Sequence, residues 1–292
     1  MPPFNTNEFE PIDVAVGENV RLRGVEHGPK NGPLVLLLHG FPASWASWRA
    51  QIRPLANAGF RVVAPDLRGY GASSRPQNPR AYETANLVAD VVGLVHAMGA
   101  ERAHIAGHDW GGIVAWWTAM LEPHAVERLA ILNAPHPVAF AAALRRREQR
   151  KRSAYVFFFQ VTGLAEWWLS RGDFAWIRAA FRPSAITDDD VNQYVRAIAA
   201  PGALTATLNY YRAAFREELL RRTPRARRID HPTLVLWGDR DRFLGPELAS
   251  PPPRWVANAR VKHFPAAAHW VLADAPDDVS ARLVEHFRGP AA

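Results

Sequence analysis

The sequence predicts an α/β fold with a mostly parallel central sheet that is interrupted by a helical insertion. Strand-length apolar runs alternate with helical stretches over the first 135 residues. This alternation stops between residues 136 and 228 and resumes afterwards. Continuous apolar runs are typical of strands buried on both faces. Strands that alternate with helices imply parallel pairing through right-handed crossovers.

The elements of the first part can be placed in order from these patterns. Two short strands are expected between Val14 and Glu26, with a turn near residues 17–19. Gly59 and Gly99 follow the first two helical stretches and end them. The expected elements that follow are strand 33–38, helix 45–57, strand 61–65, helix 83–98, strand 103–106, helix 111–121 and strand 126–132.

The pattern breaks at residues 133–137, after the sixth expected strand. A helical, arginine-rich and aromatic segment follows and continues to about Arg228. Strands are expected again at 233–238 and 260–264, and a helix at 277–287 closes the chain. The sequence therefore predicts a core formed by residues 1–135 and 229–292, with a helical cap of residues 136–228 inserted into it.

Composition narrows the class of protein. The 292 residues are 48% hydrophobic, enough for a full core, and the absence of cysteine excludes disulfides and thiolate metal sites. No stretch resembles a signal peptide or is long enough for a membrane span, so a cytoplasmic location is expected. The net charge of +7 comes with no nucleic-acid-binding motif. We therefore interpret the arginine runs as a solvated helix face and expect no nucleic-acid partner.

The stretch Gly107-His108-Asp109-Trp110-Gly111 has the form of a nucleophile elbow with aspartate in place of serine. A carboxylate that attacks a saturated carbon forms an ester that activated water can hydrolyse, whereas attack on an acyl carbon would form an anhydride. The expected substrate therefore has an electrophilic saturated carbon, as in an epoxide or a carbon–halogen bond. The alternative role for Asp109 is a helix N-cap.

A nucleophilic carboxylate needs a base and an acid that orients the base. His269 follows the last expected strand, and Asp241 follows the preceding one. The order nucleophile, acid, histidine is that of this elbow motif. Asp239 is the alternative acid.

The oxyanion of ester hydrolysis also needs donors. We expect these to be the backbone N–H groups of Trp110 and Phe41. The Phe41-Pro42 bond is a candidate cis peptide, and His39 is expected to form structural hydrogen bonds.

Together these motifs resemble the α/β-hydrolase-fold epoxide hydrolases over essentially the whole chain. In that family two cap tyrosines bind the epoxide oxygen and protonate it as the ring opens. By the match of the surrounding segments these are Tyr155 and Tyr211, with Tyr210 as the adjacent alternative. The motifs that carry the resemblance are His39-Gly40-Phe41-Pro42, Asp66-Leu67-Arg68-Gly69-Tyr70-Gly71-Ala72-Ser73, Gly107-His108-Asp109-Trp110-Gly111-Gly112, Asp241 and His269.

The resemblance implies conversion of a small-molecule epoxide and water to a vicinal diol through an ester on Asp109, hydrolysed by water that His269 activates. It implies no cofactor, and no spacing of ligands indicates a metal site. A haloalkane dehalogenase with the same nucleophile and a non-catalytic ligand-binding protein are the alternatives. The oligomeric state stays open. The residues expected to line an apolar pocket are Phe41, Pro42, Trp110, Phe158 and Phe159.

Overall fold

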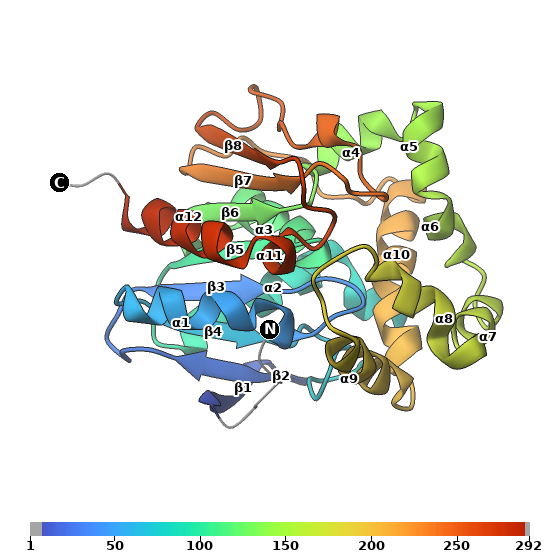
Figure 1. Ribbon diagram of the computed structural model, residues 1–292, viewed down its shortest axis with the longest axis horizontal. Coiled ribbons are helices and arrows are strands. Elements are labelled where there is room, and N and C mark those ends of the chain that lie inside the picture. The colour runs from blue at the N-terminus through green and yellow to red at the C-terminus, as the bar shows by residue number, and fades with distance from the viewer. Residues whose placement is uncertain (1–7, 290–292) are drawn as a thin grey trace.

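The computed structural model describes residues 8–289 and contains one eight-stranded sheet in the order β1-β2-β4-β3-β5-β6-β7-β8 (Figure 1). β1 and β2 pair antiparallel, as do β2 and β4, whereas every other neighbouring pair is parallel. This confirms the mostly parallel sheet. The strands are β1 (Glu10–Gly17), β2 (Val20–His27), β3 (Leu34–Leu38), β4 (Arg61–Pro65), β5 (Ala103–His108), β6 (Val126–Leu132), β7 (Thr233–Gly238) and β8 (Ala259–Phe264).

The burial of the strands follows their apolar character. Every residue of β3, β5 and β7 is buried, as continuous apolar runs predict for central parallel strands. β1, at the antiparallel edge, alternates between exposed and half-buried residues. The carboxyl ends of β3, β5, β6 and β7 therefore meet at one edge of the sheet, where open α/β sheets bind their ligands.

Helices cover both faces of the sheet. Figure 1 shows α1, α11 and α12 in front of the strands and α2 and α3 behind them. The expected helix at 45–57 is divided into a 3-10 turn and α1. The helices of the core are η2 (Trp45–Trp48), α1 (Arg49–Asn57), η3 (Pro79–Tyr82), α2 (Thr84–Ala97), α3 (Trp110–Leu121), η4 (Pro123–Ala125), η5 (Pro246–Leu248), α11 (Val271–Asp274) and α12 (Pro276–Arg288).

The chain between β6 and β7 is helical, and its helices lie beyond one end of the sheet (Figure 1). The phenolic O–H of Tyr210 in this insertion donates to the carbonyl of Arg68 at 2.8 Å, and the carboxylate of Glu217 accepts from Thr84. These bonds fasten the insertion to the loops of the sheet. Its helices are α4 (Pro137–Ala143), α5 (Arg147–Arg152), α6 (Ala154–Phe158), α7 (Leu164–Leu169), α8 (Arg171–Ala180), α9 (Asp188–Ala199) and α10 (Ala203–Leu219).

Among residues 8–289, no helix is both long enough and apolar enough to cross a bilayer. The expected cytoplasmic location stays a prediction.

Candidate active site

Asp109 lies on the sharp turn between β5 and α3. Its φ of 50° is in the left-handed region, which non-glycine residues rarely adopt. A Cβ at Gly107 would overlap the carbonyl of Gly111, and one at Gly111 would overlap the carbonyl of Leu38. The glycines therefore permit the close approach of chain segments that this turn requires. Asp109 occupies the N-cap position of α3, but its side chain makes no capping hydrogen bond, so it does not serve as a helix cap.

Backbone N–H groups hold the Asp109 carboxylate in place. Phe41 N–H donates to Oδ1 at 2.8 Å, and the N–H of Trp110 helps to lower the pKa of the carboxylate. The Phe41-Pro42 peptide is cis, as expected. Burial raises the pKa of Asp109, but interactions with His269 and the N–H of Trp110 outweigh it and hold the pKa below the usual value of 3.8. Asp109 is therefore ionised at neutral pH.

His269 lies between two carboxylates. Its Nε2 is 3.6 Å from Oδ2 of Asp109, and its Nδ1 is 2.7 Å from Oδ2 of Asp241. Burial alone would lower the pKa of His269, but the two carboxylates raise it to about 10. Before substrate binds, the site therefore holds an imidazolium flanked by two anions.

Asp241 is held by three donors. The N–H groups of Phe243 and Leu244 donate to Oδ1 at 2.7 and 3.1 Å, and Asn133 Nδ2 donates to Oδ2 at 2.9 Å. The alternative acid, Asp239, instead contacts His263 Nδ1 at 2.6 Å. The structure therefore places Asp241, and not Asp239, against His269.

Asn133 and His108 also contact the site, although the sequence analysis assigned a role to neither. Asn133 follows β6 at the same sheet edge, and its position there is the signal that could have indicated it. His108 is fully buried, and its Nε2 donates to the carbonyl oxygen of His269 at 2.9 Å. Burial lowers the pKa of His108 to about 4, so its ring is neutral. This bond fastens the loop of His269 to the end of β5.

His39 has the structural contacts that were expected. Its Nε2 accepts from the N–H of Leu67 at 3.0 Å, and its Nδ1 donates to the carbonyl of Gly40 at 3.1 Å. Burial lowers the pKa of His39 to about 4, so the ring stays neutral and keeps both bonds. His39 thereby connects the loops that follow β3 and β4.

Tyr155 of α6 and Tyr211 of α10 face the site from the insertion. Both side chains line the cavity, their rings are 6.0 Å apart, and the Tyr211 ring lies 5.0 Å from that of Trp110. Burial raises the pKa of both phenols, so both hydroxyls stay protonated. Tyr210 is fully buried and bonded to Arg68, away from the cavity. The structure therefore brings Tyr211 to the site and leaves Tyr210 in the core.

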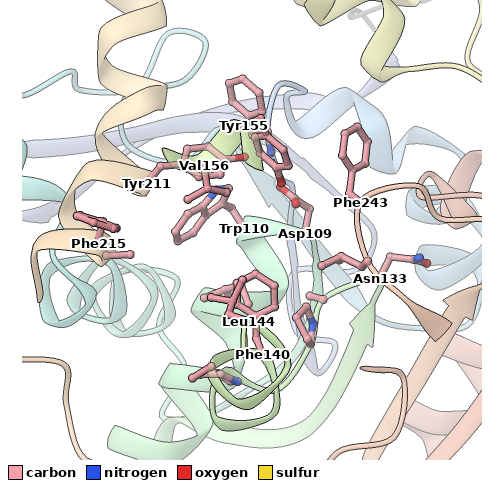
Figure 2. A pocket seen from close by; sticks show the side chains of 18 of the residues that line it. Asp109, Trp110, Asn133, Phe140, Leu144, Tyr155, Val156, Tyr211, Phe215 and Phe243 are labelled. Atoms are coloured by element: carbon pink, nitrogen blue, oxygen red, sulfur yellow. Dashed lines mark hydrogen bonds between the residues drawn. The ribbon is translucent and has the colours of Figure 1, made fainter. Parts of the chain in front are cut away.

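The charged groups and the tyrosines line one cavity of about 340 Å³ between the sheet edge and the insertion. Figure 2 shows Asp109, Trp110, Tyr155 and Tyr211 gathered at one end, with Phe140 and Leu144 further along. Apolar side chains form most of the wall, which is typical of a site for a small apolar ligand. The predicted lining residues Phe41, Pro42 and Trp110 are among them.

The other two predicted lining residues, Phe158 and Phe159, do not line this cavity. α6 instead turns Tyr155 and Val156 toward it. Phe159 is fully buried beneath Tyr155, with ring centroids 5.3 Å apart, and Phe158 packs on Trp168 at 5.2 Å. The prediction was wrong because successive residues of a short helix point in directions about 100° apart.

Within residues 8–289, no group of three or more histidine, aspartate or glutamate side chains is arranged to hold a metal ion.

Comparison with known proteins assigns the family. The model of the alpha/beta hydrolase fold matches residues 33–276. The chain belongs to the α/β hydrolase fold family. It is 38% identical over 266 residues to the AB hydrolase superfamily protein YfhM of Bacillus subtilis, covering 89% of this chain and 92% of YfhM. It is 35% identical over 272 residues to mouse Epoxide hydrolase 4, covering 89% of this chain and 74% of that protein.

The fold also matches a solved structure of this family along nearly its whole length. The Bacillus megaterium epoxide hydrolase in complex with an inhibitor superposes with a TM-score of 0.86 at 31% identity, covering 96% of this chain and 100% of that one. The resemblance to epoxide hydrolases expected from the motifs is confirmed by these comparisons.

Proposed function

We propose that this α/β hydrolase fold protein is an epoxide hydrolase that needs no cofactor. The observation that supports this most directly is the pair of hydroxyls of Tyr155 and Tyr211 in the same cavity as the Asp109 carboxylate, which the N–H of Phe41 holds in place. Hydroxyl donors suit a ring oxygen that develops negative charge as its bond to carbon breaks. The relatives that are named epoxide hydrolases support the same reaction.

In the first step Asp109 attacks one epoxide carbon. Oδ1 is engaged by Phe41, so Oδ2 is the atom that forms the new carbon–oxygen bond. The ring carbon–oxygen bond breaks, its electron pair goes to the ring oxygen, and that oxygen takes a proton from Tyr155 or Tyr211. The products are a hydroxyalkyl ester on Asp109 and one tyrosinate.

Ester formation changes the state of His269. The charge of Asp109 is lost, and this removes part of what raises the pKa of the imidazolium. The pKa of each buried phenol stays above its usual value of 10. A proton therefore passes, directly or through water, from His269 to the tyrosinate. His269 becomes the neutral base that the second step requires.

In the second step His269 takes a proton from water, and the hydroxide attacks Cγ of Asp109. The N–H groups of Phe41 and Trp110 stabilise the oxyanion. The tetrahedral intermediate expels the alkoxide, which takes the proton from His269 and leaves as a vicinal diol. The carboxyl group that remains gives its proton to His269, which restores the ion pair of the resting site.

The insertion has a defined part in this proposal. Residues 136–228 act as a cap over a core of residues 1–135 and 229–292. α6 and α10 supply the tyrosines, and the enclosed space keeps bulk water from the attacking carboxylate.

Intact-protein mass spectrometry on His269→Gln tests the proposal, with a terminal epoxide and a matched bromoalkane as separate reagents. Without its base the enzyme should stall as the ester, so we expect a hydroxyalkyl adduct from the epoxide alone and none in the control Asp109→Ala. An adduct from the bromoalkane alone would instead make the protein a haloalkane dehalogenase. No adduct with either reagent would favour a ligand-binding role and contradict the mechanism.

A further inference from the structure

The exposed large hydrophobic side chains gather on one part of the molecule. All those found within residues 8–289 belong to the insertion. Leu219 is 70% exposed and Trp167 54%, values that are unusual for side chains of this size. Exposed apolar surface of this extent marks sites of interaction. The residues, here called the Trp167 patch, are Phe157, Val161, Leu164, Trp167, Trp168, Phe215, Leu219 and Leu220.

The helices that carry the Trp167 patch are tied together. Arg212 of α10 bonds both carboxylate oxygens of Glu166 in α7, at 2.7 and 3.0 Å, and donates to the carbonyl of Phe159 beside α6 at 2.9 Å. The rings of Phe157 and Phe215 are 6.1 Å apart, so the patch continues from α6 to α10. In Figure 1, α6 and α7 lie at the edge of the molecule away from the sheet.

Exposed basic residues of the insertion accompany the Trp167 patch. The guanidinium of Arg171 lies 4.7 Å from the Trp167 ring. The carboxylate of Glu166 in α7 forms an ion pair with Arg212. Glu148 of α5 is an exposed acidic residue in the same insertion. Other exposed basic residues of α5 and the end of α10 form no ion pair within residues 8–289: Arg147, Arg150, Lys151, Arg216, Arg221 and Arg222.

The Trp167 patch also adjoins the cavity. Phe215 is 38% exposed and belongs to the patch, yet it lines the cavity that holds Asp109. The exposed side chain of Glu218, one turn further along α10 than Ala214, lines the same cavity. The cavity therefore reaches the surface at the border of the patch.

We propose that the Trp167 patch docks on the surface of an anionic lipid bilayer. Tryptophan and leucine suit the boundary between headgroups and acyl chains, and arginines near that depth attract anionic lipids. A second copy fits less well, because a two-fold contact would bring the same arginines of both copies together. Docking does not depend on the reaction. Docking would also let lipophilic epoxides enter the cavity from the bilayer past Phe215, and this consequence rests on the proposed function.

Co-sedimentation of the full chain with vesicles tests the docking without any turnover. We expect binding to phosphatidylcholine vesicles that contain about one third phosphatidylglycerol, weaker binding to pure phosphatidylcholine, and loss of binding as salt screens the arginines. Trp167→Ser combined with Leu219→Ser should lower the partition coefficient about tenfold or more. Neither residue lines the cavity, so turnover of a water-miscible epoxide should persist and report an intact fold.

The charge contribution has a matched control. Arg216→Ser with Arg221→Ser should lower the partition coefficient several-fold, by about the attraction of two cations to an anionic surface. Arg102→Ser with Arg260→Ser removes the same charge from exposed positions outside the insertion. This control should leave the partition coefficient unchanged.

Two kinds of result would overturn the proposal. One is no binding of the wild type to the anionic vesicles, or equal binding by the Trp167/Leu219 variant. The other is a dimer in lipid-free solution that the same variant dissociates, because the patch would then be covered by a second copy. If Leu219→Ser alone is examined, a smaller loss of vesicle binding in the same direction is expected.

Discussion

The amide of Asn133 donates at 2.9 Å to the same Asp241 oxygen that contacts Nδ1 of His269 at 2.7 Å. Asn133 has a φ of 39°, which asparagine tolerates better than most residues. Its side chain also accepts from the N–H of Gly238 at 2.9 Å. Asn133 therefore links the ends of β6 and β7 and fixes the direction of the carboxylate that orients the base.

Replacing Asn133 should affect the second half of the reaction most. In Asn133→Ala, Asp241 loses a donor and Gly238 an acceptor, so we expect ester hydrolysis to slow about tenfold and the free energy of unfolding to fall by about 1–3 kcal/mol. Rapid-quench kinetics can measure alkylation and hydrolysis separately. Asn258→Ala, at an exposed position, is the control. Equal slowing of alkylation and hydrolysis would contradict a role through Asp241.

The tyrosines should affect the first half of the reaction. Tyr155→Phe and Tyr211→Phe each remove one donor to the ring oxygen, so each should slow alkylation about a hundredfold, and the double variant should not alkylate measurably. Tyr210→Phe is the matched control, because it removes a bond to Arg68 and should cost only about 1 kcal/mol of stability. Single-turnover measurement of the rate of ester formation tests this prediction. Unchanged alkylation in the double variant would favour dehalogenation.

The charged groups could be predicted because they follow strands. A residue after a buried parallel strand lies at the carboxyl edge of the sheet, whatever the side chains of the loop do. Asp109, Asp241 and His269 each occupy such a position, and the structure brings them together. Family resemblance was needed for Tyr155 and Tyr211, since nothing in the helical periodicity places α6 and α10 over that edge.

The other residues of the site could not be predicted, because sequence periodicity does not show in which direction a side chain points. Asn133 was seen only as part of a break in the pattern, although its amide completes the site. Phe158 and Phe159 were expected at the cavity, yet Phe158 packs on Trp168 and Phe159 packs between Tyr211 and Phe41, because packing sets the orientation of α6. Likewise His108 lies inside the elbow motif, but its bond to the backbone of His269 depends on a loop that is distant in sequence.

Gly40 should be as necessary as the elbow glycines. A Cβ there would overlap the carboxylate of Asp109. In Gly40→Ala the carboxylate must move from the N–H of Phe41, and a displacement of about 1 Å can slow catalysis about a hundredfold. Gly17→Ala is the control, because its Cβ would meet open space. Steady-state turnover and a thermal melt test this, and an active Gly40→Ala with normal alkylation would show that Asp109 is not confined as described.

The stability of the protein should depend on pH through His269. Folding raises the pKa of His269 from 6.5 to about 10, so the folded state favours its protonated form. The resulting stabilisation is fully present below pH 6.5 and is lost as the pH rises to about 10. The lowered pKa of Asp109 has the opposite sign, since its contribution is present above 3.8 and disappears on acidification.

A comparison of wild type with His269→Gln isolates this effect. The variant leaves Asp109 and Asp241 without the cation between them, so its melting temperature should be lower than that of the wild type at pH 6.5. The gap should narrow steadily toward pH 10, because the wild-type imidazolium loses its proton over that range. Calorimetric melting curves of both proteins at matched ionic strength measure the gap. A gap in melting temperature that widens with rising pH would mean that His269 is neutral in the resting site. The proton transfers proposed for the two steps would then have to start from neutral His269.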